Sequence, residues 1–111
     1  AVNHEFVVVS GHLAPDNPES LVNWDALAKL SGTLVLLMAV ERIELFAEAL
    51  LNGGRPAQTP ALVVQHGTTS AERVVRATLA DLPERIRAEA IRPPAIIVIG
   101  SVAGFETLSR L

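Results

Sequence analysis

The sequence predicts an α/β fold: a single three-layer domain with a mixed, mostly parallel sheet of about five strands flanked by helices. Four short runs are continuously apolar and rich in β-branched residues, which is typical of strands buried on both faces. Helical patterns alternate with these runs, and such alternation is characteristic of a wound sheet. A length of 111 residues, 50% of them hydrophobic, is enough for one core but not for two.

The strands and helices are predicted from local pattern alone. Continuous apolarity predicts strands at residues 6–9, 33–38, 61–64 and 95–99, and a fifth is predicted at 73–77. Helical patterns cover residues 24–30, 41–51 and 80–90, with Asn23 as a cap for the first. Within the second helix, apolar side chains recur at helical spacing, and Gly53-Gly54 follow as a stop signal.

Composition excludes several classes of protein. With 9 basic and 12 acidic residues the net charge is -3, so no overall field favours nucleic acid or an anionic membrane. The absence of cysteine excludes disulfides and cysteine-ligated metal, and is compatible with a reducing cytoplasm. The longest apolar run, residues 34–40, is far short of the roughly 20 residues of a membrane helix. The chain begins at Ala1 without an initiator Met, which we interpret as the start of a fragment.

Three loops are candidates for a ligand site, because ligands of open α/β sheets gather beyond the carboxyl ends of the strands. They are residues 10–12, 38–39 and 65–68. If their strands run in the same direction, the three loops share one edge. Taken by itself, Met38 fits a core-filling role, since thioethers fill irregular gaps. Gly67 alone fits a turn that requires a residue without a side chain.

Specific catalytic motifs are not found. His12 and His66 lie in loops, but without carboxylates or a second histidine at ligand spacing they do not predict a metal site. Ser10 lacks the flanking glycines of a nucleophile elbow, so a hydrolase is not indicated. Gly53-Gly54 end a helix and do not form a phosphate-binding loop.

Two arginines in the fourth predicted strand allow two interpretations. Arg73 and Arg76 fall on opposite faces if the strand alternates regularly. Guanidinium groups suit a substrate rich in carboxylates. Alternatively, they lie at a solvated strand edge or form ion pairs within the domain, with Glu72 or Asp81.

Five stretches carry a resemblance to a known family. They are VVSGH at residues 8–12, LLMA at 36–39, PALVVQHGTT at 60–69, RVVRATL at 73–79 and PPAIIVIG at 93–100. Together they resemble, along nearly the whole chain, the C-terminal part of the tetrapyrrole methylase family, in particular its members that methylate uroporphyrinogen III. Ala39 and Ala77 stand where the family usually has Gly.

The resemblance implies a set of site residues. Residues 1–111 would form the C-terminal domain, and the N-terminal domain, with its Gly-rich loop and acid/base residues, has no counterpart in this sequence. We therefore assign no catalytic residue here. The resemblance implies S-adenosyl-L-methionine as cofactor and uroporphyrinogen III as substrate. The cofactor residues that it implies are Met38, Ala39, Gly67 and Ala95. The corresponding substrate residues are His12, Arg73 and Arg76.

The implied function is C-methylation of uroporphyrinogen III to precorrin-2, for sirohaem or cobalamin synthesis. The enzyme would be a cytoplasmic homodimer in full length, and this fragment, which supplies one wall of the cleft, would need its own N-terminal domain for activity. One alternative is another tetrapyrrole methyltransferase, acting on a later precorrin. The other is a non-catalytic α/β interaction domain. No nucleic acid, membrane or metal partner is implied.

Overall fold

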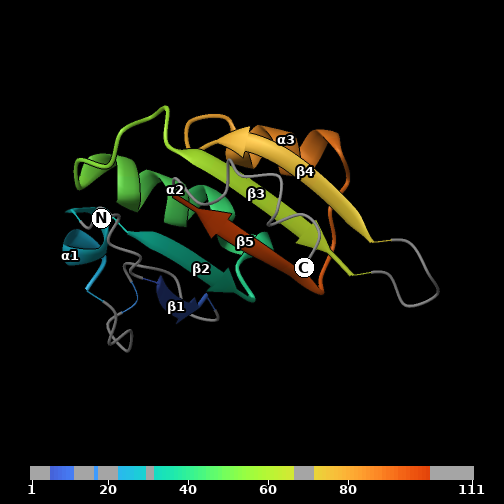
Figure 1. Cartoon of the computed structure of the whole chain (residues 1–111), viewed down its shortest axis with the longest axis horizontal. Coiled ribbons are helices and arrows are strands. Elements are labelled where there is room, and N and C mark those ends of the chain that lie inside the picture. The colour runs from blue at the N-terminus through green and yellow to red at the C-terminus, as the bar shows by residue number, and fades with distance from the viewer. Residues whose placement is uncertain (1–5, 12–16, 18–22, 30–31, 67–71, 101–111) are drawn as a thin grey trace, which may run out of the picture.

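The computed structural model describes residues 6–11, 17, 23–29, 32–66 and 72–100 (Figure 1). Within these residues lie five strands: β1 (Phe6–Ser10), β2 (Thr33–Leu37), β3 (Pro60–Gln65), β4 (Arg73–Thr78) and β5 (Ala95–Ile99). The helices are α1 (Trp24–Lys29), α2 (Ile43–Asn52) and α3 (Leu82–Ala88). A short 3₁₀ helix, η1 (Val40–Arg42), directly precedes α2. Every strand and helix predicted from the sequence is confirmed, with small shifts at the ends. None of the helices described is long and apolar enough to cross a membrane.

The sheet is mixed, with the strand order β1-β2-β5-β3-β4. β1 and β2 are parallel, whereas β2–β5, β5–β3 and β3–β4 are antiparallel. The predicted five-stranded mixed sheet is thus confirmed, but the prediction that it is mostly parallel is wrong. The chain reverses once between β3 and β4, so β4 and β5 run against the first three strands. Because β5 then inserts between β2 and β3, most neighbours are antiparallel (Figure 1).

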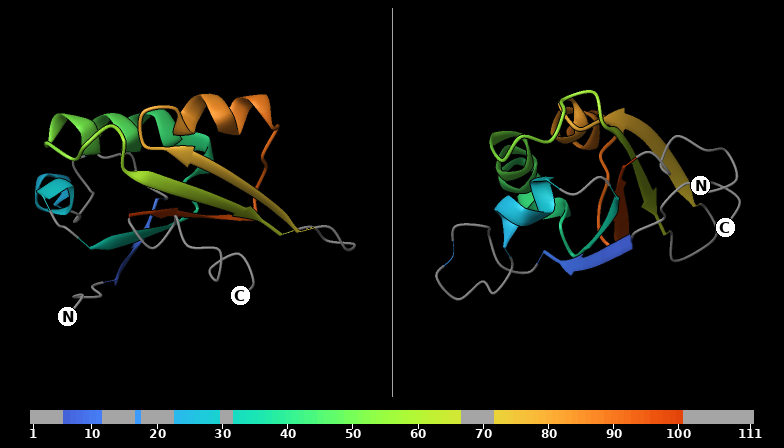
Figure 2. Two further views of the ribbon diagram at one scale, coloured as in Figure 1. Left: turned by 45° about the horizontal axis from the view of Figure 1, so that its top comes forward. Right: turned by 60° about the vertical axis from the view of Figure 1, so that its left-hand side comes forward.

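The three helices pack on one face of the sheet, where they form the main core. Figure 2 shows α2 (green) and α3 (orange) on the same side of the strands. This core combines buried side chains of all three helices with alternate residues of the strands, such as Leu36, Val63 and Ile97. The alternation follows from the period of two in a strand, which sends neighbouring residues to opposite faces.

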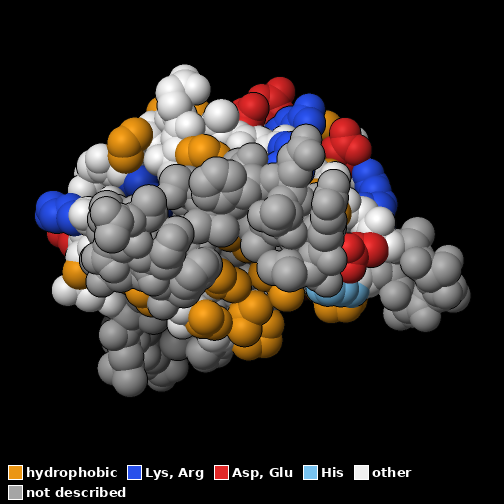
Figure 3. Space-filling view, in the orientation of Figure 1, with side chains coloured by type: hydrophobic (Ala, Val, Ile, Leu, Met, Phe, Trp, Pro, Cys, Tyr) orange, Lys and Arg blue, Asp and Glu red, His pale blue; other side chains and the backbone are white. Residues whose placement is uncertain are grey.

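The second face of the sheet is also apolar. Leu62 and Val98 are buried there, and Val35, Val64 and Ile96 pack against them. Figure 3 shows hydrophobic side chains gathered on this side of the molecule. Among the described residues, no helix contributes to this second cluster, so the described part has two layers and not the predicted three.

Local sequence explains how the helices begin and which side they bury. Asn23 caps α1 as predicted, since its Oδ1 accepts a hydrogen bond from the Ala26 N–H at 3.0 Å. In α2 the apolar side chains at helical spacing are the buried ones: Ile43, Phe46, Ala47 and Leu50. This face of α2 supports the turn that follows β2.

Candidate functional site

The predicted ligand loops converge at one edge of the sheet. β1, β2 and β3 run in the same direction, so Ser10, Leu37 and Gln65 end at this edge. β5 runs the opposite way between β2 and β3, and therefore begins there, at Ala95. The prediction that these loops share an edge is confirmed for their described residues. His12 and Gly67 lie outside the described residues.

A pocket of about 540 Å³ opens between the ends of β2 and β3. Its walls are mostly apolar and come from three segments of the chain. The lining residues are Leu37, Met38, Val40, His66, Pro93, Pro94, Ala95 and Ile96. The pocket therefore brings together Met38 and Ala95, two of the residues singled out in the sequence.

Met38 is held in an unusual conformation at the mouth of this pocket. Its φ is +56°, in the left-handed region, which costs a residue with a side chain about 1–2 kcal/mol relative to glycine. Met38 as a whole residue is 63% exposed. The exposure excludes the core-filling interpretation of Met38, because an exposed side chain contributes little packing to the fold.

Ala39 faces away from the pocket and into the core. It is fully buried, and a Cβ added to Gly11 would lie 2.8 Å from the Cβ of Ala39 and 2.9 Å from a ring carbon of Phe46. The loop after β1 thus passes so close to the loop after β2 that Gly11 has no room for a side chain. The methyl group of Ala39 packs in this contact and does not line the pocket.

Two hydrogen bonds connect the β5 side of the pocket wall to the end of β3 and the residue after it. The side-chain Oε1 of Gln65 accepts a hydrogen bond from the Arg92 N–H at 2.7 Å. The His66 N–H donates to the Pro94 carbonyl at 3.0 Å. These bonds hold the segment that leads into Ala95.

His66 is the one titratable side chain among the lining residues that the structure describes. Its Nδ1 lies 3.7 Å from Glu72 Oε2, and both side chains are about half exposed. The described residues contain no group of three or more side chains arranged to hold a metal ion.

The two arginines of β4 have different environments. Arg73 donates to the Glu89 carbonyl at 2.6 Å and to Glu89 Oε1 at 2.9 Å. An ion pair within the domain is therefore present, but its partner is neither Glu72 nor Asp81, the partners considered from the sequence. The Asp81 carboxylate instead accepts from the N–H and the hydroxyl of Thr78. Arg76 is exposed, on the opposite face of β4.

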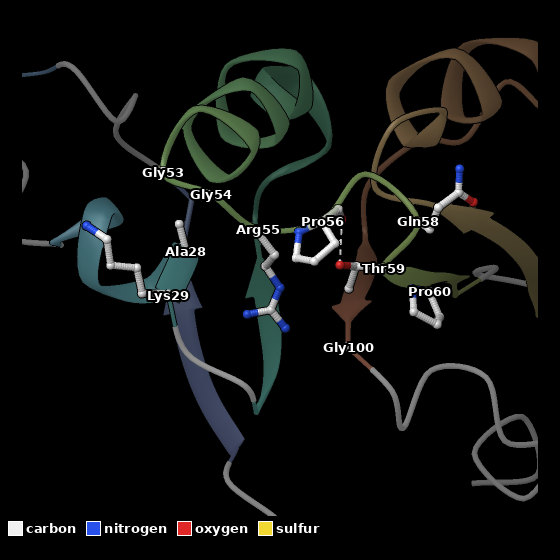
Figure 4. Close-up of a pocket in the computed structure, with 10 residues that line it drawn as sticks. All are labelled: Ala28, Lys29, Gly53, Gly54, Arg55, Pro56, Gln58, Thr59, Pro60 and Gly100. Carbon is white, nitrogen blue, oxygen red and sulfur yellow. Dashed lines mark hydrogen bonds between the residues drawn. The ribbon is translucent and has the colours of Figure 1, made fainter.

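A larger pocket, of about 790 Å³, lies at the opposite edge of the sheet (Figure 4). Its buried Arg55 lies among backbone carbonyl groups: the guanidinium donates to Gly32 at 2.6 Å and to Leu27 and Ile99 at 3.4 Å. Burial lowers the pKa of Arg55 from its ordinary value. Arg55 therefore links the end of α1, the start of β2 and the end of β5, which is a structural role.

Arg55→Met is expected to destabilise the fold by about 1–3 kcal/mol, because it leaves buried carbonyl groups without their donor. Urea unfolding followed by circular dichroism measures this loss. Lys29→Met, which alters an exposed cation beside the same pocket, is the control and should change stability by less than about 0.5 kcal/mol. Equal stabilities of the two variants would contradict the structural role of Arg55.

Sequence reasoning did not identify several residues that shape the site. Gln65 and Arg92 meet only because β3 and β5 pair in a register that places Gln65 opposite Ala95. Pro93-Pro94 were visible as a pair before the last strand, and two prolines ahead of a strand are a usable signal for a rigid wall.

Comparisons with known proteins agree with this architecture. The family model of the Tetrapyrrole (Corrin/Porphyrin) Methylases matches residues 2–83. The uroporphyrinogen-III C-methyltransferase of Methanocaldococcus jannaschii is 41% identical over 99 residues, which are 87% of this chain and 40% of that protein.

Two solved structures are similar in fold. The uroporphyrin-III C-methyl transferase of Thermus thermophilus, complexed with S-adenyl homocysteine, matches 89% of this chain with a TM-score of 0.68 and 35% identity. A cobalt precorrin-4 methyltransferase, a cobalamin biosynthetic enzyme, matches 91% of this chain with a TM-score of 0.78 and 26% identity.

The chain spans 42% of each of these two solved chains, so it corresponds to less than half of such a protein. Its agreement with the family is nevertheless broad. The family model covers well over half of the chain, and the similarity to the Thermus thermophilus structure extends over 89% of it. The chain belongs to the tetrapyrrole methylase family.

Proposed function

We propose that this chain is the C-terminal domain of an S-adenosyl-L-methionine-dependent methyltransferase that converts uroporphyrinogen III to precorrin-2. In this proposal the chain supplies one wall of the cofactor and substrate cleft. The observation that carries it is Met38, whose exposed side chain and strained backbone stand at an apolar pocket. Strained backbone with no packing role is typical of ligand sites.

The residues present fit the proposed cofactor. The pocket volume of about 540 Å³ lies within the usual range for small-molecule sites. Apolar walls from Met38, Pro94 and Ala95 suit an adenosyl group and the carbon chain of methionine. When bound, the cofactor supplies the methyl group. We propose that Met38 and Ala95 hold it by apolar contact and that Gly67 contributes backbone. Ala39, which is fully buried and does not line the pocket, supports the turn that carries Met38.

The chemistry that we assign to this chain is alignment and exclusion of water. Methyl transfer requires the donor and the attacking carbon to be held in line, and an apolar wall removes water that competes for this arrangement. We assign no catalytic residue to this chain. For the substrate carboxylates we propose His12, Arg73 and Arg76; Arg73 also forms an ion pair with Glu89.

A second candidate function is methylation of a later precorrin. One observation favours it: the TM-score with the cobalt precorrin-4 methyltransferase is 0.78, against 0.68 with the uroporphyrin-III enzyme. Sequence identity favours the first candidate, at 35% against 26%. Side chains decide which substrate is bound, whereas backbone similarity reports only the shared fold. We therefore prefer uroporphyrinogen III.

The test compares this chain alone with the same chain joined to the N-terminal domain that we propose for it. Calorimetric titration with S-adenosylhomocysteine is expected to show weak binding by the chain alone, because half of the cleft wall is missing, and tight binding by the joined protein. Tight binding by the chain alone would contradict a shared cleft. Methyl transfer by the joined protein to cobalt-precorrin-4, but not to uroporphyrinogen III, would favour the second candidate.

A further inference from the structure

We propose that Gln65 is a positioning residue for the cofactor, which acts by fixing the wall of the pocket formed by residues 92–95. This inference rests on the proposed function and deepens it. Gln65 itself does not line the pocket. Its effect on a ligand therefore passes through the segment that it holds.

The contact geometry supports this role. Gln65 is the last residue of β3 and pairs with Ala95, the first residue of β5. Its Oε1 accepts the hydrogen bond from the Arg92 N–H at 2.7 Å, which is a short distance for this type of bond. The next residue, His66, holds Pro94 through its own N–H. The last residue of β3 and the residue that follows it thus hold both ends of the three-residue segment that precedes β5.

The composition of this segment leaves it few hydrogen bonds of its own. Pro93 and Pro94 have no N–H group, so Arg92 provides the one backbone donor of residues 92–94. Both prolines are exposed and line the pocket, so packing around them is incomplete. Removing the acceptor of Gln65 releases the Arg92 end of the segment, which shifts Pro93 and Pro94 relative to the opposite wall at Met38.

Two substitutions of Gln65 separate the acceptor from the size of the side chain. Gln65→Leu keeps a similar size and removes the acceptor. Gln65→Glu keeps an oxygen at the same position, where it accepts from the Arg92 N–H. Gln58→Leu is the matched control, because Gln58 is exposed and lies at the opposite edge of the sheet.

The experiment measures the Kd of S-adenosylhomocysteine by calorimetry, and Tm by circular dichroism, in the chain joined to its proposed N-terminal domain. Gln65→Leu is expected to raise the Kd about three- to tenfold, the equivalent of one hydrogen bond. Gln65→Glu should restore the Kd to within about twofold of wild type, and Gln58→Leu should leave it unchanged. Tm should be similar in all four proteins, because this hydrogen bond is exposed.

Three results would overturn the proposal. An unchanged Kd in Gln65→Leu shows that the segment needs no such bond. If Gln65→Leu and Gln65→Glu raise the Kd equally, the loss of the hydrogen-bond acceptor is not the cause of the weaker binding. A loss of affinity that parallels a fall in Tm shows a general structural role. In each case the wild-type protein still binds, so the proposed function stands, whereas an absence of binding by the wild type overturns both.

Discussion

Met38→Gly is expected to make the domain more stable and its cofactor binding weaker. Glycine adopts the φ of +56° without steric cost, so the free energy of unfolding should rise by about 1 kcal/mol. The same change removes an apolar side chain that we propose to contact S-adenosyl-L-methionine, which should weaken binding by about 1–3 kcal/mol. Urea unfolding and calorimetric titration with S-adenosylhomocysteine, both in the joined protein, measure the two effects.

The opposite signs of these effects separate the possible roles of Met38. Leu45→Ala is the control, because Leu45 is an exposed apolar side chain that does not line the pocket. It should leave binding unchanged. If Met38→Gly instead destabilises the fold and binds the cofactor normally, then Met38 serves packing and the proposed site is wrong.

Phe46→Ala is expected to destabilise the domain by about 3–5 kcal/mol, the usual cost of removing a buried aromatic side chain. Phe46 is fully buried, and its ring stacks on Trp24 at a centroid distance of 4.9 Å. It also contacts the close approach between Gly11 and Ala39, directly before η1. Because small domains have only about 5–15 kcal/mol of stability, the loss should be visible as a large fall in the urea midpoint.

Phe46→Leu is the matched variant, since it keeps most of the buried volume. Its cost should be clearly smaller than that of Phe46→Ala. If the Phe46→Ala variant were as stable as the wild type, the core beneath the pocket would tolerate a cavity. Such a result would contradict the role assigned to this face of α2.

The sequence by itself determined the strands and helices and indicated two residues of the pocket. Continuous apolar runs predict strands, and the spacing of Ile43, Phe46 and Leu50 predicts the buried face of α2, because both periods are set by local backbone geometry. The family motifs indicated Met38 and Ala95, and the structure places both at one pocket. The predictions for His12 and Gly67 stay predictions, since these residues lie outside the described part.

Only the tertiary structure decided the strand directions, the exposure of Met38 and the hydrogen bonds of the pocket wall. Apolarity is the same for parallel and antiparallel strands, so the reversal between β3 and β4 is invisible in the pattern. The pairs Arg73–Glu89 and Gln65–Arg92 depend on register between segments distant in the sequence. Such contacts form because the whole sheet buries its apolar surface in one arrangement, and no local preference specifies them.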